Sequence, residues 1–212
     1  MEKLIEQIKS ACIVPVIKLD SADNAVPLAS ALKRGGLNCA EITYRTAAAE
    51  ESIRHIAESF PDMLIAAGTV LTPEQADSAI KAGAAFIVSP GFNPNVVSHC
   101  IKMGYPVIPG VITPTEVEAA MSMGLTYLKF FPAEAAGGVK MIKSLSAPYT
   151  TVKFMPTGGI NIKNVADYLA CDAVFACGGS WMVPSDLISE GRFDEIEILT
   201  RDAAKLVKEI RG

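Results

Sequence analysis

The chain has 212 residues, of which 50% are hydrophobic and 20% are charged, and its formal net charge is −4. This composition excludes a disordered chain, and the scattered basic residues give no sign of nucleic-acid binding. The apolar runs are shorter than the ~20 residues of a membrane-spanning helix, and residues 1–10 lack the features of a secretory signal. We expect a cytoplasmic protein that binds neither membrane nor nucleic acid.

The cysteines and histidines predict no metal site. The five cysteines form no CxxC pair, and their odd number indicates reduced thiols in the core. His55 and His99 fall in helical patterns without an acidic or thiol partner at metal-ligand spacing, so a structural or surface role is the better interpretation. The cysteines are Cys12, Cys39, Cys100, Cys171 and Cys177.

Short apolar segments alternate with amphipathic ones along the whole chain. Residues 1–10 carry apolar side chains at helical spacing and are expected to form a helix that caps one end of the fold. The predicted strands are residues 11–18, 37–44, 63–67, 85–89, 106–109, 126–130, 152–155 and 173–177. The predicted helices are residues 21–35, 47–59, 72–82, 93–103, 114–123, 138–145, 162–169 and the stretch 184–210.

The spacing of the predicted strands indicates the fold class. Their ends fall 20 to 26 residues apart, without a linker or a change in composition. Strands rich in Val, Ile and Ala that alternate with helices predict a parallel sheet, and eight such units are typical of a (β/α)8 (TIM) barrel. We therefore expect an α/β protein with one barrel domain over residues 1–212. An open doubly wound sheet is the alternative, but the GxGxxG motif after its first strand is absent.

One lysine lies in an apolar run at the end of the sixth predicted strand, where such barrels carry their chemistry. Lys129 stands between Leu128 and Phe130. Burial disfavours the charged form of an amine and leaves a neutral nucleophile that attacks a carbonyl. The alternative is a side chain whose stem packs on the core while its ammonium group reaches water.

A carboxylate is expected to point into the same barrel from the second predicted strand. Strand alternation places Glu41, Thr43 and Arg45 on one face, with Ile42 and Tyr44 on the other. An inward carboxylate needs a partner or a function. A buried ion pair without a catalytic role is the alternative for Glu41.

Glycine-rich turns follow the last two predicted strands, PTGGI at residues 156–160 and GGSW at residues 178–181. Such turns present main-chain N–H groups without side-chain cover, at the place where many of these barrels bind a phosphate. Either Gly-Gly pair alone can be only a tight turn. The occurrence of both at these strand ends predicts a phosphate site.

Together these residues suit a Schiff-base reaction on a phosphorylated keto acid. The amine condenses with a ketone, and the iminium then accepts the electrons released by C–C cleavage. Glu41 would move protons, while Arg45 and a threonine hydroxyl would hold the substrate carboxylate. Two alternatives stay open, namely a phosphosugar isomerase or epimerase on the same barrel and a non-enzymatic phosphate-ligand binding protein.

Six segments resemble the 2-dehydro-3-deoxyphosphogluconate (KDPG) aldolases, several of which also act on 4-hydroxy-2-oxoglutarate (KHG). The segments are EITYRT at 41–46, GTVL at 68–71, SPG at 89–91, KFFPAE at 129–134, PTGGI at 156–160 and GGSW at 178–181. The resemblance implies a class I, metal-independent aldolase without a cofactor, on a (β/α)8 barrel and in a homotrimer. The reaction it implies splits KDPG into pyruvate and glyceraldehyde 3-phosphate, as in the Entner–Doudoroff route.

The resemblance also implies roles for single residues. Lys129 matches the Schiff-base lysine, and Glu41 matches the acid/base carboxylate. Arg45 and Thr69 match the clamp on the pyruvate carboxylate. The residues that match the substrate and phosphate contacts are Thr157, Gly158, Gly159, Gly179 and Ser180.

Two matters stay open at this point. Thr157 favours the gluconate substrate over its galactonate epimer, because relatives specialised for the epimer tend to lack a threonine there. The preference between KDPG and 4-hydroxy-2-oxoglutarate is not determined. Lys18, at the end of the first predicted strand, either adds positive charge near the substrate or extends to water.

Overall fold

The computed structural model describes residues 1–211 and contains parallel strands in two sheets. One sheet has the order β5-β4-β3-β2-β1-β9, and the other has the order β6-β7-β8. The strands are short and largely buried, which agrees with their near-continuous apolar sequences. They are β1 Ile13–Ile17, β2 Cys39–Thr43, β3 Leu64–Gly68, β4 Phe86–Val88, β5 Val107–Ile108, β6 Gly110–Val111, β7 Tyr127–Phe130, β8 Lys153–Pro156 and β9 Cys177–Gly179.

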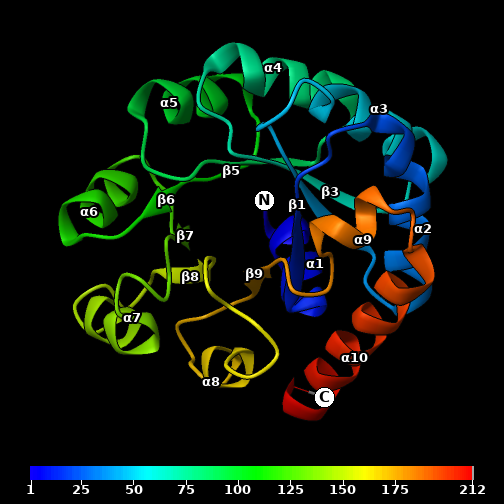
Figure 1. Cartoon of the computed structure of the whole chain (residues 1–212). Coiled ribbons are helices and arrows are strands. Elements are labelled where there is room, and N and C mark those ends of the chain that lie inside the picture. The colour runs from blue at the N-terminus through cyan, green and yellow to red at the C-terminus, as the bar shows by residue number, and fades with distance from the viewer. Residues whose placement is uncertain (212) are drawn as a thin grey trace.

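The two sheets adjoin at both of their edges. β5 and β6 are separated only by Pro109, which has no N–H to donate to a ladder but accepts a bond from the Lys129 N–H at 2.9 Å. At the other edge, single parallel bridges join Phe154 to Val174 and Thr157 to Gly178. The result is an α/β fold whose parallel strands follow a curved surface (Figure 1).

Helices α2 to α8 lie on the outer side of the curved sheets (Figure 1). Several begin where the sequence provides a cap, since the Thr72, Asn93 and Thr113 side chains each accept a hydrogen bond from the first helical turn and a proline follows each. No helix within residues 1–211 is long and apolar enough to cross a membrane. The helices are α2 Ala25–Gly35, α3 Ala49–Ser59, α4 Pro73–Ala82, α5 Pro94–Met103, α6 Pro114–Ser122, α7 Gly138–Ser146, α8 Val165–Leu169, α9 Ser185–Ser189 and α10 Phe193–Arg211.

Helix α1, Glu2–Ala11, covers the inner side of the strands at one end. It buries Leu4, Ile5 and Ile8 in a cluster with inward side chains of several strands, among them Val14 and Phe86. These partners stand near the beginnings of their strands, so α1 closes the amino-terminal end of the sheets. The carboxyl ends of the strands lie at the end of the sheets opposite to α1.

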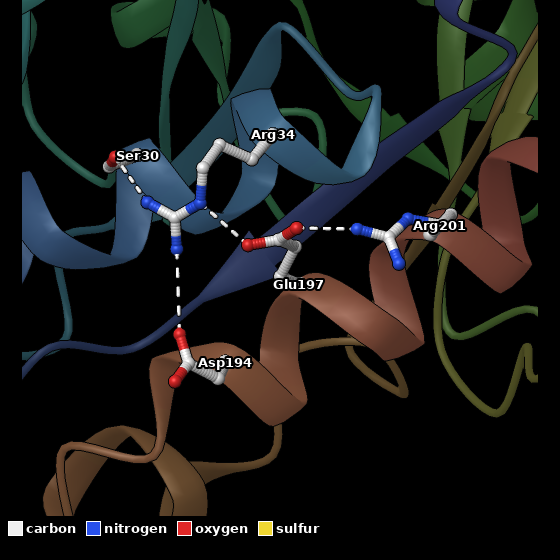
Figure 2. Close-up of polar contacts among 5 residues, drawn as sticks. All are labelled: Ser30, Arg34, Asp194, Glu197 and Arg201. Carbon is white, nitrogen blue, oxygen red and sulfur yellow. Dashed lines mark hydrogen bonds and ion pairs between the residues drawn. The ribbon is translucent and has the colours of Figure 1, made fainter.

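Helix α10 packs closely on α2 (Figure 2). A Cβ atom on Gly35 would lie 2.5 Å from the Thr200 Cβ, so only glycine permits this approach. Beside this contact, the Arg34 Nε donates to Glu197 at 2.6 Å, and Arg201 donates to the other oxygen of that carboxylate at 2.5 Å (Figure 2). The contact joins the C-terminal helix to the second helix of the chain.

The structure differs from the predicted elements at several places. A short 3-10 helix, Ala22–Asn24, precedes α2 within the predicted helix 21–35. Gly191, with φ of +69°, separates α9 from α10 within the predicted stretch 184–210. The last strand is Cys177–Gly179 rather than 173–177, because its pairing with β1 begins at Cys177 opposite Ile13.

Candidate active site

Lys129 is buried on the inner side of β7. It is 4% exposed, and its Nζ donates to the Glu41 Oε1 at 3.1 Å. The same nitrogen lies 5.5 Å from the centroid of the Phe131 ring. The side chain is therefore held inside the protein and does not extend to water as the alternative interpretation supposed.

Glu41 is fully buried on β2, and only one of its two oxygens is bonded. Oε1 accepts from Lys129, whereas Oε2 has no hydrogen-bond partner within residues 1–211. A buried carboxylate oxygen without a partner is unfavourable, so an arriving hydroxyl group or water would be bound there. Gly68 on β3 makes room for this carboxylate, because a Cβ atom at Gly68 would lie 2.1 Å from Oε1.

Thr69 follows β3 directly and has an unusual backbone. Its φ is +56°, in the left-handed region that a β-branched residue rarely adopts. Such a conformation costs of order 1–3 kcal/mol and occurs preferentially at functional sites. The half-buried Thr69 thus stands at the strand end where the substrate clamp is expected.

Arg45 is exposed in the turn after β2. It lies beyond the end of the strand, so strand alternation does not determine which way its side chain points. The strand ends at Thr43, and the Arg45 N–H donates to the Thr43 carbonyl at 2.8 Å in a turn. The Arg45 guanidinium makes no hydrogen bond or ion pair in the described part of the chain. Its position beyond the strand end leaves it available to an anionic ligand.

The glycine turn after β8 has two successive left-handed residues, Gly158 with φ of +103° and Gly159 with φ of +82°. Thr157 precedes them and is 5% exposed, and its Oγ1 has no partner among residues 1–211. The carbonyls of Thr157 and Gly158 accept bonds from the N–H groups of Ala133 and Glu134, at 2.8 and 3.0 Å. The turn is therefore tied to the segment that follows Lys129.

The last residues of β9 contact Thr157, which precedes the glycine turn after β8. A Cβ atom on Gly178 would lie 2.4 Å from the Thr157 Oγ1, and one on Gly179 would lie 2.0 Å from the Trp181 ring. Ser180 is exposed next to them. The sequence placed Gly178 and Gly179 in a turn after the last strand, but both lie within β9 and pair with β1. The phosphate site stays a prediction.

Lys18 and the cysteines lie outside this arrangement. Lys18 forms a surface ion pair with Asp20 at 2.7 Å. The five cysteines are buried free thiols, and burial raises the pKa of Cys39 to about 12. No group of three metal-ligating side chains occurs in the described chain.

Sequence reasoning overlooked the role of Gly68 and the contact of Glu134 with the glycine turn. The Tyr168 hydroxyl donates to the Glu134 carboxylate, and the aliphatic stem of Glu134 packs on Gly159. The only sequence signal for Gly68 was its place at the end of a strand next to the one that carries Glu41. Tyr168 gave no signal, because it reads as a core residue of a helix.

A family model described as "Aldolase: KDPG and KHG aldolase" matches residues 4–199. A 2-dehydro-3-deoxy-phosphogluconate aldolase of Treponema pallidum is 48% identical over 98% of this chain and 99% of its own length. The "KHG/KDPG aldolase" of Escherichia coli is 43% identical over 92% of both chains. The chain therefore belongs to the KDPG and KHG aldolase family.

Solved structures agree with this membership. A KDPG aldolase of Legionella pneumophila, with pyruvate captured as a covalent carbinolamine intermediate, has a TM-score of 0.90 and 40% identity, over 93% of this chain and 96% of its own. The aldolase of Zymomonas mobilis ZM4 with 3-phosphoglycerate has a TM-score of 0.89 and 34% identity, over 96% of both chains.

Proposed function

We propose that this chain is a class I aldolase that cleaves 2-dehydro-3-deoxy-6-phosphogluconate to pyruvate and glyceraldehyde 3-phosphate. The observation that carries the proposal is the buried Lys129 amine, 3.1 Å from the Glu41 carboxylate at the ends of β7 and β2. The printed names of the relatives support the substrate, and the pyruvate carbinolamine of the Legionella structure supports the covalent step.

The reaction begins with attack of the Lys129 Nζ on the C2 ketone, and loss of water from the carbinolamine gives an iminium. A proton then leaves the C4 hydroxyl for Glu41, the C3–C4 bond breaks, and its electrons form an enamine with the iminium carbon. Glyceraldehyde 3-phosphate departs. Protonation of the enamine at C3 and addition of water then release pyruvate and the free amine.

The remaining residues bind and orient the substrate in this proposal. Arg45 and Thr69 hold the C1 carboxylate, because a guanidinium binds a carboxylate strongly. The Thr157 hydroxyl contacts the bound substrate. The main-chain N–H groups of the glycine turn after β8, with Gly179 at the end of β9 and Ser180 after it, bind the phosphate. The iminium serves as the electron sink, so the mechanism uses neither a metal ion nor a cofactor.

We also propose that the strands close into one (β/α)8 barrel, formed by a single domain over residues 1–212. The bridges between the β8 and β9 edges, the continuity of β5 and β6 through Pro109 and the outer position of the helices support this closure. A homotrimer and a cytoplasmic location stay predictions. Sedimentation equilibrium at micromolar concentration tests the trimer, and a mass of 22.4 kDa, that of one chain, would contradict it.

Reductive trapping tests the mechanism. Borohydride with pyruvate is expected to leave one covalent adduct, which peptide mass spectrometry locates on Lys129. The Lys129→Ala variant should form no adduct and lose cleavage activity, while the wild type keeps its activity in a chelator. An adduct on Lys18, or no adduct, would contradict the mechanism.

A second candidate activity is the cleavage of 4-hydroxy-2-oxoglutarate to glyoxylate and pyruvate. The name of the Escherichia coli relative favours it, since that name includes KHG. Side-by-side kcat/KM values for the two substrates decide which activity dominates. A phosphosugar isomerase or epimerase would not retain pyruvate after borohydride treatment.

A further inference from the structure

The glycine turn after β8 is held from outside the strands by Glu134 and Tyr168. Tyr168 lies on α8 and is 1% exposed, and its hydroxyl donates to the Glu134 Oε1. The stem of Glu134 packs on Gly159 so closely that a Cβ atom there would lie 2.6 Å from the Glu134 Cγ. The turn can therefore not move toward Glu134, and Tyr168 fixes Glu134.

Three successive carbonyls of this turn are all bonded. The Thr157 carbonyl accepts from the Ala133 N–H at 2.8 Å, and the Gly158 carbonyl accepts from the Glu134 N–H at 3.0 Å. The Gly159 carbonyl accepts from the side-chain amides of Asn161 and Asn164, at 3.1 Å each.

These bonds determine where the N–H groups of the turn point. In a trans peptide the N–H of one residue points opposite to the carbonyl of the residue before it. The bonded carbonyls of Thr157, Gly158 and Gly159 therefore direct the N–H groups of residues 158, 159 and 160 away from their bonding partners. Successive main-chain N–H groups in a turn with left-handed residues, such as Gly158 and Gly159, can form a concave anion site. Glu134 takes part twice, through its N–H and through its side chain.

We propose that Glu134 and Tyr168 are positioning residues that set the preference of the enzyme for phosphorylated substrates, by holding the N–H groups of residues 158–160 in the orientation that binds phosphate. This inference rests on the proposed aldolase function. Neither residue touches the reacting carbon atoms in this scheme, because both act through the turn. A loosened turn should weaken phosphate binding while it leaves Schiff-base formation at Lys129 intact.

The Tyr168 hydroxyl remains a donor over the working pH range. Burial is the main cause that raises the pKa of Tyr168 well above its ordinary value, and the hydrogen bond to Glu134 raises it further. The contact with Glu134 is therefore kept at neutral and mildly alkaline pH.

The test compares a phosphate-dependent with a phosphate-independent reaction in the same variants. KM and kcat are measured for KDPG cleavage, and the exchange of pyruvate methyl protons with D2O reports on the Schiff base without any phosphate. Glu134→Ala is expected to raise KM for KDPG about 10-fold or more, as for the loss of one hydrogen bond to a charged group. We expect kcat and the pyruvate exchange rate to stay within about twofold.

Two conservative variants distinguish positioning from a general structural role. Glu134→Gln keeps the stem and an acceptor oxygen, so its KM is expected to return close to that of the wild type. Tyr168→Phe keeps the buried ring and loses only the donor, and it should raise KM in the same direction as Glu134→Ala. It also provides the measurement if Glu134→Ala fails to fold.

The chain offers a matched control in the Tyr149–Glu118 pair, where a tyrosine hydroxyl donates to a glutamate at 2.7 Å before β8 begins. Tyr149→Phe and Glu118→Ala should leave the KM for KDPG unchanged. Equal losses in KDPG cleavage and pyruvate exchange, or an unchanged KM in Glu134→Ala and Tyr168→Phe, would overturn the inference. Absence of pyruvate exchange in the wild type would overturn the proposed function instead.

Discussion

The two oxygens of Glu41 have different surroundings. Oε1 bonds to the Lys129 amine, and Oε2 is buried without a partner in the described chain. In the proposed mechanism one oxygen orients the Lys129 amine, while the other takes a proton from a substrate hydroxyl.

Replacing Glu41 by glutamine separates these two tasks. Glu41→Gln keeps the volume and an acceptor oxygen for Lys129, but it removes the base. We expect kcat for cleavage to fall about 100-fold or more, as for the loss of a general base, while borohydride trapping of pyruvate persists. Steady-state kinetics and intact-mass measurements check this. Parallel losses of turnover and trapping would assign Glu41 a structural role only.

For single residues, the sequence predicted the features that follow from neighbouring residues and strand alternation. Lys129 could be recognised because its neighbours Leu128 and Phe130 are apolar, and Glu41 because strand alternation points it inward. The left-handed Thr69 could not be predicted, since a β-branched residue rarely adopts that conformation. The space beside Gly68 could not be predicted either, because it depends on the Glu41 side chain of another strand. The prediction for Arg45 assumed strand alternation, but β2 ends at Thr43, so the position of Arg45 depends on the turn that follows.

At the scale of elements, the contact between α2 and α10 contains a carboxylate between two arginines (Figure 2). Glu197 accepts from Arg34 and Arg201, and the hydrogen bond from Arg34 is the main reason that the pKa of Glu197 is lowered. A carboxylate with a lowered pKa in the folded state stabilises the protein above its unfolded pKa. This contribution is lost as the pH falls through the lowered folded value.

The pH dependence of unfolding tests this pair. Glu197→Gln should be less stable than the wild type at pH 7, and the difference should shrink as the pH falls below about 4, near the ordinary pKa of a glutamate. Urea denaturation at pH 7, 5, 4 and 3 measures the difference. Arg34→Gln should reduce the pH dependence in the same way. A difference that stays constant from pH 7 to pH 3 would contradict the assignment.

Capping residues explain which element boundaries were predictable. Thr113 with Glu116 forms a capping box, so the beginning of α6 agrees with the predicted residue 114. The predicted helix 162–169 begins later, at Val165. The side-chain amides of Asn161 and Asn164 donate to the Gly159 carbonyl, and the Asn161 N–H donates to the Asn164 side-chain oxygen, so these residues do not continue a helix. Such side-chain competition with the helix has no periodic signature.

At the scale of the whole molecule, α1 supplies part of the core between the strands. Ile8 is fully buried in that cluster, and Ile8→Ala should lower the free energy of unfolding by about 2–5 kcal/mol. Ile198→Ala is the matched control, since Ile198 is 53% exposed and should change stability by less than about 0.5 kcal/mol. Urea denaturation measures both. Equal effects would show that α1 contributes little to the fold.

The near-regular spacing of strands predicted the parallel α/β arrangement, because parallel strands need a helical crossover of similar length each time. The division into two sheets was not predictable. It depends on Pro109 between β5 and β6 and on single bridges between β8 and β9, which no periodic pattern records.

The helix that closes one end of the strands also has a kinetic consequence. Because α1 covers the amino-terminal end, substrate and both products share the opposite end as their route. In the proposed mechanism the three-carbon fragment is still bound to the buried Lys129 when the aldehyde is formed. Product release in the proposed reaction is therefore ordered: glyceraldehyde 3-phosphate departs first and pyruvate last. Added pyruvate is expected to compete with the substrate for the free enzyme.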